Sequence, residues 1–233
     1  MRTGQLIAPE QLTSKTTRTA VVTGAAGDLG GAVARRLAAD GWTVFGADIA
    51  DATESEPFTA VSLDVQDRAG VFALAERAGA EGPLGIWVNA AGIAAAARII
   101  DADPATWDRI IGVNLTGSYH GCAAALRTMS KGTGGRIVNV GSISGQIGGL
   151  GMHPAYAASK AGVHALTKSY ALEGVKHGVM CNAVAPSVIE GAMARSFSEA
   201  QLKAVVATNP MRRLATMDEI VEAICFLADP ERS

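Results

Sequence analysis

The sequence predicts one α/β domain built on a doubly wound parallel sheet with helices on both faces. Short, β-branched and nearly all-apolar runs alternate with longer runs of helical period rich in alanine and leucine. This alternation is typical of repeated βαβ units, whose strands are covered on both sides. The chain has 233 residues, 48% of them hydrophobic, which is enough to bury a single large core.

The elements are expected in a regular order along the chain. Strands are predicted over residues 19–23, 43–47, 59–63, 85–89, 136–140 and 179–184. A first helix is expected over 30–39, where Val33 and Leu37 mark one face, with longer helices around 114–129 and 155–177 and a last one over about 217–228. Residues 1–17 contain no hydrophobic signal segment, and we expect them to be a flexible N-terminal extension.

Composition and charge argue against several classes of protein. The net charge is −2 and no basic block occurs, so a nucleic-acid partner is not expected. No apolar run has membrane-spanning length, and we expect no membrane partner. Cys122, Cys181 and Cys225 lie far apart, without a CxxC pair or histidines at ligand spacing. We therefore expect no disulfide framework, no metal and a cytoplasmic location.

A glycine-rich turn, Thr23-Gly24-Ala25-Ala26-Gly27-Asp28-Leu29-Gly30, joins the first strand to the first helix. Small residues let a dinucleotide pyrophosphate approach the backbone, and free N–H groups at a helix N-terminus attract the anion. The second strand leads to Asp48, which can accept hydrogen bonds from the adenosine ribose hydroxyls and would repel a 2′-phosphate. These features predict NAD rather than NADP. Each also has a purely structural alternative: the glycine-rich segment as a tight turn, and Asp48 as an ordinary carboxylate at the end of a strand.

Ordered motifs make the sequence resemble the classical short-chain dehydrogenase/reductases from about Arg18 to Asp229. The glycine turn is similar to the family's TGxxxGxG, with Asp28 at its middle glycine. The other motifs are Leu63-Asp64-Val65, Asn89-Ala90-Ala91-Gly92, Val113-Asn114-Leu115-Thr116-Gly117, Gly141-Ser142-Ile143-Ser144-Gly145, Tyr156-Ala157-Ala158-Ser159-Lys160 and the segment 182–189. The resemblance implies a Rossmann-type fold over 18–233, with a substrate lid around 187–210 and without the family's usual seventh strand at the C-terminus.

The resemblance also implies which residues hold the NAD cofactor. They are Gly24, Gly27, Asp28, Leu29, Gly30, Asp48, Ile49, Asp64, Val65, Asn89, Ala90, Gly92, Tyr156, Lys160, Pro186, Ser187 and Ile189. Two further positions depart from the family, which usually has glycine at Ser187 and threonine at Gly191. Asp28 is expected near the cofactor phosphates, where its side chain could cap the first helix.

Four residues are expected to be catalytic: Asn114, Ser142, Tyr156 and Lys160. Tyr156 and Lys160 are one helical turn apart and share a face. The Lys160 ammonium and the positive nicotinamide ring should lower the tyrosine pKa from its usual ~10 and make Tyr156 a general acid/base. Ser142 should stabilise charge on the substrate oxygen, and the resemblance implies that Asn114 holds a water linking Lys160 to solvent.

The expected function is NAD(H)-dependent interconversion of a small secondary alcohol and its ketone by hydride transfer. Reduction of a 3-oxoacyl thioester by the same machinery remains an alternative. A non-catalytic dinucleotide-binding regulator is a second alternative, which the departures at Asp28, Ser187 and Gly191 keep open. The long helices around 114–129 and 155–177 are expected to form a homodimer or homotetramer interface.

Overall fold

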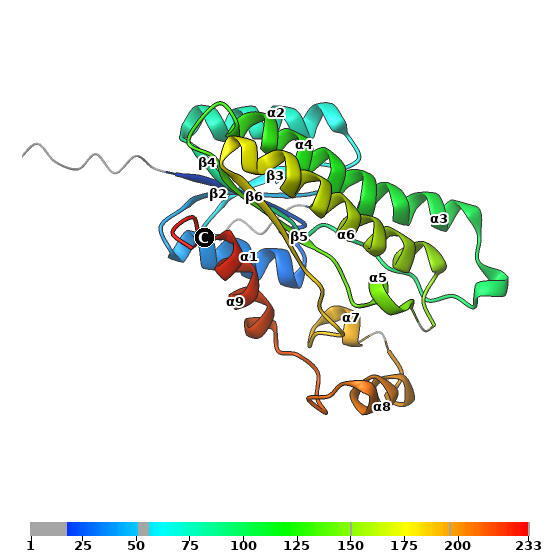
Figure 1. The fold of residues 1–233 in the computed structure, drawn as a ribbon. Coiled ribbons are helices and arrows are strands. Elements are labelled where there is room, and N and C mark those ends of the chain that lie inside the picture. The colour runs from blue at the N-terminus through cyan, green and yellow to red at the C-terminus, as the bar shows by residue number, and fades with distance from the viewer. Residues whose placement is uncertain (1–17, 51–55, 150, 196, 233) are drawn as a thin grey trace, which may run out of the picture.

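The computed structural model describes residues 18–50, 56–149, 151–195 and 197–232, so the predicted extension 1–17 lies outside the described residues (Figure 1). Six parallel strands pair in the order β3-β2-β1-β4-β5-β6. They are β1 (Thr19–Thr23), β2 (Thr43–Asp48), β3 (Thr59–Ser62), β4 (Leu84–Asn89), β5 (Gly135–Val140) and β6 (Val179–Val184). The predicted doubly wound sheet is confirmed, and β6 forms the edge of this six-stranded sheet.

Two layers of helices cover the sheet, as Figure 1 shows. One face carries α2 (Arg68–Glu81), α4 (Gly117–Met129) and α6 (Pro154–Gly174), and the other carries α1 (Asp28–Ala39) and α9 (Met217–Ala228). Shorter elements are η1 (Ile99–Asp101), α3 (Pro104–Ile111), η2 (Gly112–Thr116), α5 (Ser144–Ile147), η3 (Val175–His177), α7 (Ala192–Arg195) and α8 (Glu199–Thr208). Among the described residues, no helix combines the length and the apolarity that crossing a membrane requires.

Alternating side chains of the strands separate the interior into two cores. In β1, Val21 packs into the core under α2 and α4, while Ala20 and Val22 pack into the core under α1 and α9. Trp87 of β4 is fully buried in the first core, and Ile224 of α9 is fully buried in the second. Because successive side chains of a strand point to opposite faces, nearly continuous apolar strands supply both cores.

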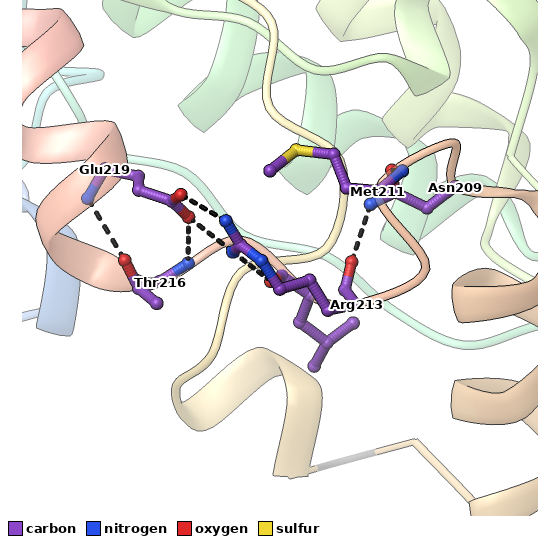
Figure 2. Close-up of polar contacts among 6 residues, drawn as sticks. Asn209, Met211, Arg213, Thr216 and Glu219 are labelled. Atoms are coloured by element: carbon purple, nitrogen blue, oxygen red, sulfur yellow. Dashed lines mark hydrogen bonds and ion pairs between the residues drawn. The ribbon is translucent and has the colours of Figure 1, made fainter.

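The segment between β6 and α9 forms a long loop that contains α7 and α8, and its two ends lie side by side. Its two ends meet where the Glu190 amide donates to the Ala215 carbonyl oxygen at 2.9 Å, beside a bridge between Ile189 and Ala215. Figure 2 shows how Arg213 fastens the returning chain to the first turn of α9 through Glu219. That pairing holds the pKa of Glu219 at about 2. The predicted lid is therefore a loop with a fixed stem.

A buried polar network joins β4, β5 and α6. The Asn89 amide nitrogen donates to Asn139 Oδ1 at 2.8 Å, and the Asn139 amide nitrogen donates to Thr167 Oγ1 at 2.9 Å. Trp87 Nε1 donates to Asn89 Oδ1 at 2.8 Å, and Cys122 Sγ lies 3.4 Å from Asn139 Oδ1. Buried polar groups that are hydrogen-bonded cost little free energy of folding, whereas removing one partner inside a core lowers the stability of the fold substantially.

Asn139→Ala should lower the free energy of unfolding by about 2–4 kcal/mol, because it removes the 2.8 Å acceptor of the Asn89 amide nitrogen and creates a small cavity. Denaturant unfolding followed by circular dichroism measures the change. Thr167→Val, which removes a hydroxyl that accepts from Asn139 and donates to the Val163 carbonyl but keeps the side-chain volume, should cost about 1 kcal/mol. A loss below about 0.5 kcal/mol for Asn139→Ala would contradict the importance given to this network.

Candidate active site

A cavity of about 530 Å³ opens at the carboxyl ends of the strands, on both sides of the point where the strand order reverses between β1 and β4. Every predicted cofactor-binding residue except Asn89 lines it, as do Ser142, Tyr156 and Lys160 of the predicted catalytic set. Further lining residues were not among the predicted site residues. Some belong to the quoted motifs or depart from the family pattern, namely Leu63, Ala91, Val113, Gly141 and Gly191, and the others are Gln66, Ile93, Arg109, Val140, Glu190 and Met217.

The turn from β1 into α1 is shaped for close approach of a phosphate. Gly24 has a φ of +75°, and a Cβ there would lie 2.7 Å from the Ala91 backbone. A Cβ on Gly30 would lie 2.1 Å from the Gly24 carbonyl oxygen, so the turn and the helix touch directly. The helix N-cap is Gly27, which supplies no capping side chain. The open N-terminus and the bare turn therefore fit the pyrophosphate of a dinucleotide.

Asp48 lies at the end of β2 and faces the same turn. Its Oδ2 accepts a hydrogen bond from the Ala26 amide at 3.0 Å, and its Oδ1 accepts one from the Ala50 amide at 3.1 Å. These two bonds hold the half-buried carboxylate at the cavity wall. Asp48 therefore presents a fixed negative charge where the sequence places the adenosine ribose.

The loop after β3 forms another part of the wall. Asp64 is exposed, and its Oδ1 accepts a hydrogen bond from the Gln66 amide at 2.8 Å. Val65 is buried, and its carbonyl oxygen lies 3.1 Å from His120 Nδ1. A small apolar surface beside an oriented carboxylate suits an adenine ring and its amino group, which the resemblance assigns to this segment.

Asn114 lies in a single π-helical turn, η2, that interrupts the expected long helix before α4 begins. Its side chain is fully buried and spans two segments: Oδ1 accepts from the Ile93 amide at 2.8 Å, and Nδ2 donates to the Ile93 carbonyl and to Ser159 Oγ. The π turn thereby places the Asn114 side chain where it contacts both the loop after β4 and helix α6. Such turns occur often at functional sites.

Ser142, Tyr156 and Lys160 meet beside Asn114. Lys160 Nζ donates to the Val140 carbonyl oxygen at 2.7 Å and lies 5.9 Å from the centroid of the Tyr156 ring. A Cβ on Gly92 would lie 3.4 Å from both Lys160 Nζ and Asn114 Oδ1, so these two polar atoms flank the same exposed glycine. The structure thus brings the four predicted catalytic residues together at one end of the cavity.

Burial controls the protonation of this group. Desolvation lowers the pKa of Lys160 to about 8. It also raises the pKa of Tyr156, against a smaller lowering by the hydrogen bond with Ser142. The chain alone therefore disfavours the phenolate, and the lowered tyrosine pKa that the sequence led us to expect would require the positive charge of the nicotinamide ring as well.

Two residues have roles that the motifs did not indicate. The Asn89 side chain belongs to the buried network under the cavity rather than to its wall. His153 is buried, accepts a hydrogen bond from the Ala155 amide as the N-cap of α6, and places Nε2 3.2 Å from the Asp103 carbonyl. Ile93 and Met217 line the cavity, and only the position of Ile93, directly after the Asn89–Gly92 motif, could have indicated this.

Comparison with known proteins assigns the family. A family model described as enoyl-(acyl carrier protein) reductase matches residues 24–233. The chain is 37% identical to a 3-oxoacyl-[acyl-carrier-protein] reductase of Vibrio harveyi, over 91% of this chain and 90% of that protein. It is 39% identical to a cis-4-hydroxycyclohexanecarboxylate dehydrogenase of Sinomonas cyclohexanicum, over 93% of this chain and 91% of that protein.

A solved structure shares this fold. The crystal structure of gox2181 superimposes with a TM-score of 0.85 at 34% identity, covering 92% of this chain and 89% of that one. Gly24–Gly30 of the glycine turn, the strands β2 to β6 and the grouping of Asn114, Ser142, Tyr156 and Lys160 lie within the matched region. The chain therefore belongs to the classical short-chain dehydrogenase/reductase family, whose members are oxidoreductases that bind a nicotinamide dinucleotide.

Proposed function

We propose that the protein is an NAD(H)-dependent oxidoreductase that interconverts a secondary alcohol and its ketone, with Tyr156 as general acid/base. The observation that carries this proposal is the buried cluster of Ser142, Tyr156 and Lys160 at one end of the dinucleotide cavity. A nicotinamide dinucleotide held in this cavity would supply the hydride acceptor for oxidation and the hydride donor for reduction. Everything else in the reaction concerns one proton on the substrate oxygen, and this chain supplies the groups that move it.

Tyr156 takes the hydroxyl proton as the C–H electron pair leaves the carbinol carbon as hydride and the C–O bond becomes C=O. In the reverse direction the phenol returns that proton to the oxygen. Ser142 is buried and hydrogen-bonds with Tyr156, so its hydroxyl is placed to orient the same oxygen and to stabilise charge on it. Lys160 holds a positive charge one helical turn from Tyr156 and favours the phenolate when the phenol loses its proton.

A proton path to solvent follows from the position of Lys160. Its ammonium and Asn114 Oδ1 flank Gly92, whose exposed backbone borders the cavity. A water at this point could exchange protons with Lys160 and with bulk solvent. Asn114 acts in this path by holding the loop at Ile93 through both atoms of its amide.

The choice of NAD rests on the charges at the ribose end. Asp48 is fixed there by two backbone amides, and an added 2′-phosphate would face its negative charge. Among the described residues that line the cavity, Arg109 and Lys160 are the basic ones, and neither lies on β2. An acidic residue without a basic neighbour on this strand favours NAD.

The surroundings of Tyr156 indicate an apolar substrate body. Tyr156 packs in a cluster with Ile110, Met152 and Ala155, against which Ile93 and Phe197 also pack. This fits a compact alcohol, such as the cyclic one named for the Sinomonas relative. The Vibrio relative favours a second candidate, reduction of a 3-oxoacyl thioester, which the same proton chemistry would serve. The assembled catalytic group argues against a purely regulatory binder.

We further infer a homodimer or homotetramer that uses α4 and α6. Tyr119 on α4 and Leu172 on α6 expose 45% and 76% of their surface, although both are large and apolar. Val175, directly after α6, is 66% exposed. Apolar surface on adjacent helices is typical of a subunit interface. The three cysteines are free and buried, which fits a cytoplasmic enzyme.

Tyr156→Phe should reduce kcat by about 1,000-fold, because the ring stays while the proton carrier is lost. NADH fluorescence with secondary alcohols, hydroxy acids and 3-hydroxyacyl thioesters measures turnover and identifies the better substrate class. Tyr170→Phe, on the same helix and away from the cavity, should leave kcat unchanged. Turnover that survives Tyr156→Phe would reject the mechanism, and a wild type that binds NADH without turning over any substrate would favour the regulator.

Asp48→Ala should reduce the ratio of kcat/KM for NAD to that for NADP by about tenfold or more, because repulsion of the 2′-phosphate disappears. Steady-state rates with each cofactor provide the ratio. Asp101→Ala removes the same charge from an exposed ion pair and should not change it. A wild type that prefers NADP would overturn the assignment of Asp48.

The burial of Lys160 predicts a pH-dependent stability. Its pKa of about 8 in the fold is below its ordinary 10.5, so between these values the unfolded chain binds more protons and the stability contributed by Lys160 rises with pH. Lys160→Met should therefore stabilise the cofactor-free protein most below pH 8, and this gain should shrink towards pH 10.5. Denaturant unfolding at pH 7 and 10 tests this, with exposed Lys168→Met as control. A gain independent of pH would contradict it.

A further inference from the structure

Asp28 occupies an unfavourable place for an anion-binding site. It is the first residue of α1, directly after the N-cap, and lines the cavity where the helix N-terminus attracts a pyrophosphate. The other charged residues of the described cavity wall are Asp48, Asp64 and Glu190, with Arg109 and Lys160 as the basic ones. The charge of Asp28 therefore opposes the two negative charges of a dinucleotide pyrophosphate unless a nearby cation offsets it.

Gly191 provides the space that the Asp28 side chain occupies. A Cβ at this position would lie 2.9 Å from Asp28 Oδ2, and the φ of +153° also favours glycine. A residue with a side chain at 191 would push against the carboxylate from the stem of the lid. The two departures from the family pattern, one in the glycine turn and one after β6, thus contact each other.

Arg195 supplies the compensating charge from the lid. Its Nη2 lies 3.5 Å from Asp28 Oδ2 and comes from α7, four residues beyond Gly191. The side chain is 71% exposed, and a guanidinium has five N–H donors in a planar fork. A single contact with one carboxylate oxygen leaves donors available for a second anion beside Asp28.

We propose that Arg195 is a further cofactor-binding residue, which Asp28 positions over the pyrophosphate end of the cavity. In this clasp, defined as Asp28 and Arg195, the guanidinium cancels the charge of Asp28 and donates to the pyrophosphate oxygens of the dinucleotide. The clasp joins the lid to the glycine turn at the start of α1. It rests on the dinucleotide site of the proposed function but holds equally for NADH and NADPH, because both carry the same pyrophosphate.

Removing the clasp should change the affinity for the cofactor without changing the folding stability. An exposed ion pair adds little to stability, so removing Arg195 should leave the unfolding temperature of the cofactor-free protein unchanged. Its loss should appear instead in the dissociation constant of the dinucleotide, because the guanidinium then neither offsets the charge of Asp28 nor donates to the pyrophosphate. Replacing Asp28 by asparagine should make Arg195 less important, since the repulsion that it offsets is gone.

Titration calorimetry with NADH and with NADPH tests the clasp in a double-mutant cycle. Arg195→Ala should weaken binding of both by about tenfold, and Arg195→Lys, which keeps the charge, by about threefold or less. In an Asp28→Asn background, Arg195→Ala should cost only about twofold to threefold. Lys203→Ala, which removes a cation from the lid helix α8, where Lys203 pairs with Glu199, is the matched control and should have no effect.

The cycle can overturn the clasp in two ways. An Arg195→Ala protein that binds like Lys203→Ala would show that Arg195 does not contact the cofactor. An equal loss from Arg195→Ala with and without Asp28 would show that the two residues do not act together. Failure of the wild type to bind either dinucleotide would instead reject the cofactor site itself, and the clasp with it.

Discussion

Parallel pairing of β1 with β4 is the constraint on which the rest of the molecule depends. These strands lie where the sheet reverses its order, so the segments that follow them separate and leave a crevice at their carboxyl ends. The glycine turn enters this crevice from β1, and the Asn89–Gly92 motif enters it from β4. The contact between Gly24 and the Ala91 backbone closes its floor, which is why a side chain cannot be accommodated there.

The active-site electrostatics follow from that crevice. Lys160 is buried in it with a carbonyl oxygen as partner, and desolvation brings its pKa to about 8. The same burial raises the pKa of Tyr156, so the chain holds the phenol protonated until another positive charge enters the site. In the proposed reaction, desolvation would thus couple proton transfer to cofactor binding. Arg195 of α7 adds a further positive charge beside Asp28, which lines the cavity.

Much of the fold could be predicted because its signals are local. The apolar runs located all six strands. β2 ends only one residue later than predicted, because Asp48 pairs with Ser62 of β3. Roles that depend on distant partners were harder. Asn89 ends a cofactor motif, yet its amide belongs to a buried network with Asn139, fifty positions away. His153 lies three residues before the predicted catalytic tyrosine, but it accepts from the Ala155 amide as a helix cap and its ring also contacts the Asp103 carbonyl.

The sequence by itself determined the doubly wound class, the order of the elements and the residue types of the catalytic group, because periodicity and short motifs depend on near neighbours. The tertiary structure decided what those residues face. It placed Asn114 in a π turn between two segments, and it brought Gly191 and Arg195 against Asp28 from the opposite end of the chain. Contacts across the crevice arise only when the strands pair, and no local pattern carries them.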